Sequence, residues 1–246
     1  MARYLLTISY LGTNFCGWQV QNNGNTVQKE ICDAAYKLFG VKTNITGCSR
    51  TDSGVHAREF CCHFDAETAI TPEKMVDAFN NYLPDDISAL NCREVESDFH
   101  ARYWAKGKNY VYRILNSKEP NPFEVGRALH IKYHLDYKKM NDAANLFLGT
   151  YDFSAFCSSG TSVVDKVRTI SHCEVNKNND IIEISVSADG FLYNMVRIIA
   201  GTLIDVGSGK IEPEEILNII KSKDRSNAGQ TATAYGLYLN KVFYER

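Results

Sequence analysis

Hydrophobic and polar positions divide the first third of the chain into segments with strand and helix periods. Residues 2–10, ARYLLTISY, alternate with a period of two, which predicts a strand. Residues 26–39 carry apolar side chains at helical spacing, with Thr26 placed to cap the helix and Gly40 placed to end it. A second helix fits residues 71–83, with Pro72 in its first turn. The polar, glycine-containing loop between the first strand and the first helix is longer than a plain connection requires.

The remaining pattern repeats this order of elements. We expect strands at 41–49, 59–66, 107–116 and 235–245, and a turn followed by a strand within 81–95. We also expect a hairpin at 167–188 and helices at 135–149, 190–207 and 212–224. The order strand–helix–strands–helix–strand occurs once before residue 100 and again, loosely, after it. This predicts an α+β protein with two related halves, residues 1–100 and 101–246, and antiparallel hairpins in the sheet. No Pro/Gly/Ser linker separates the halves, so we expect them to share a sheet or pack tightly around a site.

Composition narrows the class of protein. The 44% hydrophobic and 23% charged residues are ordinary for a globular domain. The net charge of −2 excludes a positively charged surface over the whole protein, so any surface that binds nucleic acid must be a local basic patch. No apolar run approaches the roughly 18–20 residues of a membrane helix, and the N-terminus lacks a signal-peptide cleavage pattern. The eight cysteines include no CxxC pair, which favours reduced core thiols over a metal site. These features predict a cytoplasmic protein without a metal.

Residues 48–58, CSRTDSGVHAR, place one carboxylate among arginines. Asp52 lies between two predicted strands, with Arg50 and Arg58 on either side and Gly54 behind it. Scaffolds usually display functional groups in such loops. A turn in which the Asp side chain caps its own backbone is the structural alternative. The neighbouring guanidinium groups favour instead an ionised, oriented carboxylate that can act as a nucleophile.

Two more residues have both a structural and a chemical interpretation. Arg197 is the only charged residue between 191 and 204. Burying an unpaired guanidinium costs on the order of several kcal/mol. The side chain therefore either extends to the surface or pairs with an anionic group such as Asp52. Tyr110 lies in ARYWAKGKNYVYR. It either packs on the sheet or, with the surrounding cations, provides an RNA contact.

Six segments together resemble one family. SRTDSGVHA closely resembles the active-site loop of the tRNA pseudouridine synthase A (TruA) family, and the other segments follow in family order, nearly end to end: FCGWQVQNNGNTVQ, NYLPDDI, FHARYWAKGKNYVYRI, FLYNMVRIIAGTLIDVG and YGLYL. The resemblance implies the pseudouridine synthase fold, two RRM-like halves around a continuous mixed or antiparallel sheet with a cleft between them. It also implies a homodimer that converts uridine to pseudouridine in tRNA, usually at positions 38–40 of the anticodon arm, without metal or organic cofactor.

The resemblance also implies roles for individual residues. Asp52 matches the catalytic nucleophile, and Arg197 matches the basic residue that pairs with it. Tyr110 matches the tyrosine that packs on the target base and is a candidate general base. Arg50 matches the arginine that enters the RNA as the target nucleotide flips out, and Leu237 matches a hydrophobic wall of the pocket. Attack by Asp52 on ribose C1′, attack on uracil C6 and formation of a glycal all remain open.

One departure keeps alternatives open. Thr233 and Tyr235 stand where the family commonly has Pro and His. A paralogue that modifies another structured RNA, such as ribosomal RNA, is therefore the first alternative, and a non-catalytic RNA-binding module on the same scaffold is the second. A carboxylate glycosidase would need a second acid near the first, which the Asp52 loop does not supply.

Overall fold

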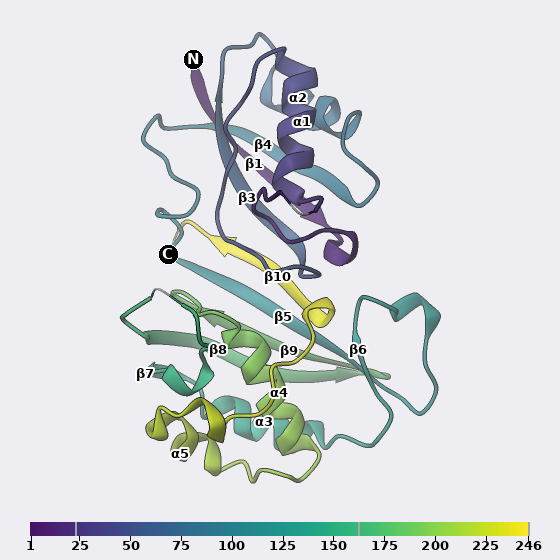
Figure 1. Ribbon diagram of the computed structural model, residues 1–246, viewed down its shortest axis with the longest axis vertical. Coiled ribbons are helices and arrows are strands. Elements are labelled where there is room, and N and C mark those ends of the chain that lie inside the picture. The colour runs from purple at the N-terminus through teal and green to yellow at the C-terminus, as the bar shows by residue number, and fades with distance from the viewer. Residues whose placement is uncertain (23, 162, 246) are drawn as a thin grey trace. The chain divides into compact units, whose positions relative to one another are not determined.

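The computed structural model describes residues 1–22, 24–161 and 163–245, and the chain forms two compact units (Figure 1). The first unit comprises Met1–Lys106 with Tyr238–Arg246, and the second comprises Gly107–Leu237. Each unit combines helices with paired strands, which confirms the predicted α+β class. Among the described residues, no helix is long and apolar enough to cross a membrane.

The first unit is built on a mainly antiparallel set of strands. β1 pairs antiparallel with β3 and with β4, and β10 runs parallel to β3 with Tyr238 opposite His56. The predicted strand at 41–49 is wrong in extent, because only the two residues of β2 find partners on β3. The elements of this unit are β1 (Ala2–Tyr10), α1 (Val27–Phe39), β2 (Thr46–Gly47), β3 (His56–Ala66), α2 (Pro72–Asn80), β4 (Ile87–Val95) and β10 (Leu237–Phe243).

Local sequence signals explain the core of the first unit. The predicted face of β1 is buried, with Leu6 and Ile8 fully excluded from solvent. Helix α1 begins where the Thr26 hydroxyl accepts the backbone N–H of Lys29, and it ends at Gly40, which has the left-handed backbone that glycine favours. Its apolar stripe faces the core, and Figure 1 shows α1 and α2 on the same side of these strands.

The second unit contains the other strands and helices. Its strand order is β5-β9-β8-β7, with β6 added in parallel beside β5. The predicted hairpin is confirmed as β8 and β9, which turn at Asn179. Its elements are β5 (Gly107–Asn116), β6 (Leu129–Ile131), α3 (Tyr137–Asn145), β7 (Gly149–Asp152), β8 (Val167–Asn178), β9 (Ile181–Ala188), α4 (Met195–Gly207) and α5 (Glu215–Ser222).

Helix α4 is the centre of the second unit and is buried along most of its length. It starts at Met195 and not near residue 190 as predicted, because Asn194 has a φ of 60°, which a right-handed helix cannot contain. Residues 229–236, which we call the strap, lie against this helix. A Cβ atom built on Gly201 would lie 1.7 Å from the carbonyl oxygen of Gln230, so only glycine allows this approach.

Candidate active site

Asp52 lies in the loop between β2 and β3 of the first unit. Its carbonyl oxygen accepts the backbone N–H of Val55 at 3.2 Å, which closes a tight turn. Gly54 occupies the turn with a φ of 79°, a conformation that glycine adopts without steric cost. Thr51 before it is buried, and Asp52 itself is half-buried. The turn therefore anchors the backbone of Asp52 at the edge of the core.

Hydrogen bonds from the segment 12–18 fix this loop in place. The backbone N–H of Gly12 donates to Nδ1 of the buried His56 at 2.9 Å, and the N–H of Trp18 donates to the Thr51 carbonyl at 3.1 Å. The carbonyl of Phe15 accepts two more bonds, from the N–H of residue 54 at 3.3 Å and from the hydroxyl of residue 53 at 3.2 Å. Four hydrogen bonds from one segment thus hold residues 51, 53, 54 and 56, which flank Asp52 in the chain.

Glycines allow the two segments to approach this closely. A Cβ on Gly12 would lie 1.9 Å from the Val55 carbonyl oxygen, and one on Gly17 would lie 2.6 Å from the Thr51 carbonyl oxygen. Trp18, stacked on a core phenylalanine of β3 with ring centres 4.1 Å apart, ties the same segment to the sheet. The start of the segment FCGWQVQNNGNTVQ, residues 15–18, therefore supports the Asp52 turn.

The two arginines that flank Asp52 in sequence have different surroundings. Arg58 donates from Nη1 to Oδ1 of Asn240 at 3.2 Å, and its guanidinium carbon lies 5.2 Å from the ring centre of Tyr238 on β10. Arg50 is exposed to solvent. Both arginines are thus exposed, but Arg58 contacts β10 from β3 whereas Arg50 lies in the loop before it.

Tyr110 lies on β5 of the second unit. It stands opposite Val186 of β9 and is 7% exposed. Its ring meets Phe191 edge to face, with centres 5.0 Å apart and an interplanar angle of 83°. The tyrosine is therefore held by packing within its own unit, and its role in RNA contact stays a prediction.

Arg197 occupies the first turn of α4 and is oriented by backbone and side-chain acceptors. Nε donates to the carbonyl of Ala232 in the strap at 2.7 Å, and Nη1 donates to Oδ1 of Asn194 at 2.8 Å. The N–H of Ala232 in turn donates to the Arg197 carbonyl at 3.1 Å. The helix dipole disfavours a cation at this end, so helix electrostatics do not explain the position.

The strap carries two further contacts that the sequence did not reveal. The hydroxyl of the fully buried Tyr112 donates to the Thr233 carbonyl at 3.0 Å and lies 3.2 Å from the Thr233 hydroxyl. Burial raises the pKa of Tyr112, so the group remains a donor. A Cβ on Gly236 would lie 2.7 Å from the Tyr112 ring, and Leu237, 7% exposed, follows directly. The glycines at 201, 229 and 236 were the available signal for this packing.

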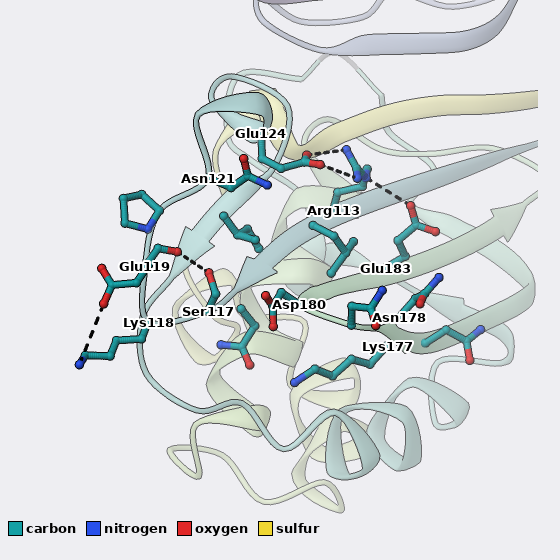
Figure 2. Close-up of a pocket in the computed structure, with 16 residues that line it drawn as sticks. Arg113, Ser117, Lys118, Glu119, Asn121, Glu124, Lys177, Asn178, Asp180 and Glu183 are labelled. Atoms are coloured by element: carbon teal, nitrogen blue, oxygen red, sulfur yellow. Dashed lines mark hydrogen bonds and ion pairs between the residues drawn. The ribbon is translucent and has the colours of Figure 1, made fainter.

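A separate pocket of about 960 Å³ lies in the second unit (Figure 2). It is lined by the loop after β5 and the β8–β9 turn, and none of the five predicted site residues lines it. Arg113 bridges Glu124 at 2.9 Å and Glu183 at 3.3 Å across this pocket. These ion pairs tie β5 to β9 and to the loop after β5, so we interpret this part of the pocket as structural. Within the described residues, no group of three His, Cys, Asp or Glu side chains is arranged to hold a metal ion.

The predicted site residues are thus divided between the units. Asp52 and Arg50 belong to the first unit, and Tyr110, Arg197 and Leu237 belong to the second. Asp52 and Arg197 are held by contacts to glycine-marked segments. Their chemical roles stay predictions.

Comparison with known proteins covers almost the whole chain. A family model described as tRNA pseudouridine synthase matches residues 6–104 and 143–245, which include every predicted site residue except Tyr110. The tRNA pseudouridine synthase A of Ruminiclostridium cellulolyticum is 49% identical over 245 residues, and those of Acetivibrio thermocellus and Thermoanaerobacter sp. (strain X514) are 48% and 47% identical over 244 residues. In each case the match covers 99% of this chain and 100% of the relative.

One solved structure, a Cbf5-Nop10-Gar1 complex, aligns with 96% of this chain and 48% of that chain at 11% identity, with a TM-score of 0.38 that supports no inference. The two segments matched by the family model and the end-to-end relatives agree with each other. The chain belongs to the tRNA pseudouridine synthase family.

Proposed function

We propose that this protein is an enzyme that isomerises uridine to pseudouridine in tRNA, with Asp52 as the nucleophile. The observation that carries the proposal is the end-to-end identity of 47–49% with curated tRNA pseudouridine synthases A. The support built around the Asp52 turn adds to it, because a nucleophile must be held in one geometry to be effective.

The reaction rearranges bonds without oxidation or reduction. The bond from ribose C1′ to uracil N1 breaks, the base rotates, and a bond from C1′ to C5 forms, while C5 loses a proton and N1 gains one. The carboxylate of Asp52 assists the first step by attack on C1′, by attack on C6, or by promoting a glycal. Tyr110 is placed in a buried, ring-packed position and is our candidate for contact with the base and for removal of the C5 proton.

Arg197 has the character of a positioning cation. Its guanidinium is fixed by the strap carbonyl and by Asn194, so its direction is set before any substrate binds. A guanidinium near a carboxylate keeps that carboxylate ionised, and exclusion of water strengthens the attraction. We propose that Arg197 does this for Asp52 during turnover.

The target uridine must leave its stack before it can react. Extrusion of a base costs a few kcal/mol, roughly, and contacts made by the enzyme offset that cost. Arg50 is exposed at the surface of the first unit, which suits a side chain that enters the RNA. Leu237 supplies apolar surface for the pocket that receives the base.

Release of tritium from uridine C5 tests the proposal directly. We expect the wild-type protein to release tritium from an unmodified tRNA transcript without added metal, and Asp52→Asn to release none while it still binds the RNA. Asp33→Asn, an exposed carboxylate of α1, is the matched control and should keep full activity. Equal release by Asp52→Asn and wild type would overturn the mechanism.

The finer assignments are tested separately. We propose positions 38–40 of the anticodon arm as targets, and chemical mapping of pseudouridine in the product would locate them. Release from a ribosomal RNA fragment but from no tRNA would replace the substrate and keep the chemistry. We propose the homodimer on the resemblance to the family alone, and the cytoplasmic location on the cysteines that include no CxxC pair. Sedimentation and cell fractionation would check these two proposals.

A further inference from the structure

Residues 99–104 of the first unit, FHARYW, expose aromatic rings on an ordered turn. Tyr103 is 75% exposed and Trp104 is 38% exposed. The Trp104 N–H donates to the His100 carbonyl at 3.0 Å. Nδ1 of His100 accepts the backbone N–H groups of Arg102 at 3.1 Å and Tyr103 at 3.3 Å. The imidazole therefore closes the turn that displays the tyrosine.

Three rings form a column from the sheet to the surface. His63 of β3 is 7% exposed, and its ring centre lies 4.9 Å from that of His100. His100 lies 4.2 Å from Tyr103, with an interplanar angle of 33°. Nδ1 of His63 accepts the Ala101 N–H at 3.1 Å, and burial lowers the pKa of His63 to about 4. The inner end of the column is thus uncharged and fixed at neutral pH.

A second row of rings holds the other side of the segment. Phe99 is buried and lies 5.1 Å from Trp104 and 5.2 Å from Tyr244. The Tyr244 hydroxyl donates to the Ala101 carbonyl at 2.8 Å. The segment is therefore anchored in the core by the side chain of Phe99 and by the backbone of Ala101. Because this backbone is already fixed, binding of a partner on Tyr103 would cost little conformational entropy of the protein.

Cations accompany the exposed ring. The guanidinium carbon of Arg102 lies 5.9 Å from the ring centre of Tyr103, and Lys106 follows on the same exposed stretch. Within the part of the chain that the structure describes, neither side chain forms an ion pair. An aromatic face beside uncompensated cations complements an unpaired base and its phosphate, because bases stack on such rings and phosphates bind the cations.

Other exposed aromatics of the first unit lack part of this arrangement. Tyr82 has Lys37 at 5.7 Å from its ring centre, but no ring contact beneath it among the described residues. Tyr36 is 58% exposed on α1 and has neither a cation nor a ring against it in the same set. Only the Tyr103 turn combines exposure, a supporting ring and a neighbouring cation in the described part of this unit.

We propose that Tyr103, supported by His100, is a stacking platform for an unpaired base of the RNA substrate, with Arg102 contacting an adjacent phosphate. The identity of the ligand as RNA rests on the proposed function, whereas the platform itself is distinct from the five predicted site residues. Its role is to position the RNA, and the isomerisation chemistry belongs to Asp52.

Binding of an unmodified tRNA transcript to variants tests the platform. All variants are made in the Asp52→Asn background, so that binding is measured without turnover. We expect Tyr103→Ala to raise Kd about tenfold, the loss typical of one base–aromatic stack, and Tyr103→Phe to stay within about twofold. Tyr36→Ala is the matched control and should bind like the parent. Arg102→Gln should lower the slope of log Kd against log salt by about one, whereas Tyr103→Ala should leave that slope unchanged.

Three results would overturn the platform. The first is a Kd of Tyr103→Ala equal to that of Tyr36→Ala. The second is a lower melting temperature or an altered salt slope in Tyr103→Ala, which would mean that the ring acts through the fold. The third is a changed sedimentation coefficient with unchanged RNA binding, which would make the turn a protein contact. Failure of wild-type tritium release would reject the proposed function alone, because the binding difference at Tyr103 is measured independently.

Discussion

Replacing Gly201 by alanine should favour the helical conformation of α4 but disrupt the contact between α4 and the strap. The added Cβ would lie 1.7 Å from the Gln230 carbonyl oxygen, and real Cβ atoms essentially never approach within 3.0 Å, so the strap must retreat by about 1.3 Å. Gly201 lies one turn beyond Arg197 on the same helix face. Gln230 is two residues from Ala232, whose carbonyl fixes the guanidinium. The strain therefore falls on the contact that orients Arg197.

The expected magnitude follows from opposing contributions. Alanine is favoured over glycine in a helix interior by about 1 kcal/mol. Overpacking in a tight contact costs about 1–3 kcal/mol, and loss of the bond between Arg197 and Ala232 costs about 1 kcal/mol more. We expect a net loss of about 1–3 kcal/mol in the free energy of unfolding. Displacement of a catalytic group by 1 Å lowers turnover by about 10²-fold, so activity should suffer more than stability.

The assay pairs thermal unfolding with single-turnover tritium release from tRNA. Gly207→Ala is the matched control on the same helix, because the nearest neighbours of its added Cβ lie outside the strap: Sδ and Cγ of the buried Met140, at 2.6 and 2.8 Å. This variant should lose stability but keep wild-type turnover, because its strain does not fall on the contact that orients Arg197. Gly201→Ala with both wild-type stability and wild-type turnover would refute the idea that the strap positions Arg197.

Other predictions concern the Asp52 support, pH and the strap. Gly12→Ala should abolish turnover because its Cβ would lie 1.9 Å from the Val55 carbonyl oxygen, and tritium release equal to wild type would contradict this. The pKa of His63 is about 4 in the folded protein and higher when unfolded, so the unfolded state binds the extra proton. The free energy of unfolding should therefore decrease by up to about 3 kcal/mol as the pH is lowered from 6.5 to 4. Urea unfolding of His63→Gln should show no such decrease from this residue. Tyr112→Phe should lose about 1 kcal/mol of stability in the same assay, since it leaves the Thr233 carbonyl without its donor; no change would show that water replaces the hydroxyl.

Elements with complete local signals were predictable from the sequence. The alternation of residues 2–10, the cap at Thr26, the stop at Gly40 and the polar turn of the hairpin 167–188 each act within a few residues. Strands β6 and β7 were missed because they have three and four residues, too short for a period. They exist because β5 and β8 offer partners, which only the folded chain defines.

The candidate site divides in the same way. The Asp52 loop was recognisable because its charged residues and glycine lie together in sequence. The supports were not, because Gly12 and Gly201 contact segments far along the chain. A glycine's role in such a contact is set by the backbone that approaches it, and composition does not report that backbone. Searching for glycines inside helices, as in α4, would have identified one of these supports.

Strand β10 has a consequence for synthesis of the protein. It pairs with β3 in the first unit, although the intervening 131 residues of Gly107–Leu237 form the second. During translation, the edge of β3 at His56 and Ala57 stays open until residues 238–243 emerge from the ribosome. The unit that begins to fold earlier is therefore finished later, and its nascent form exposes a strand edge that a chaperone or another nascent chain can bind.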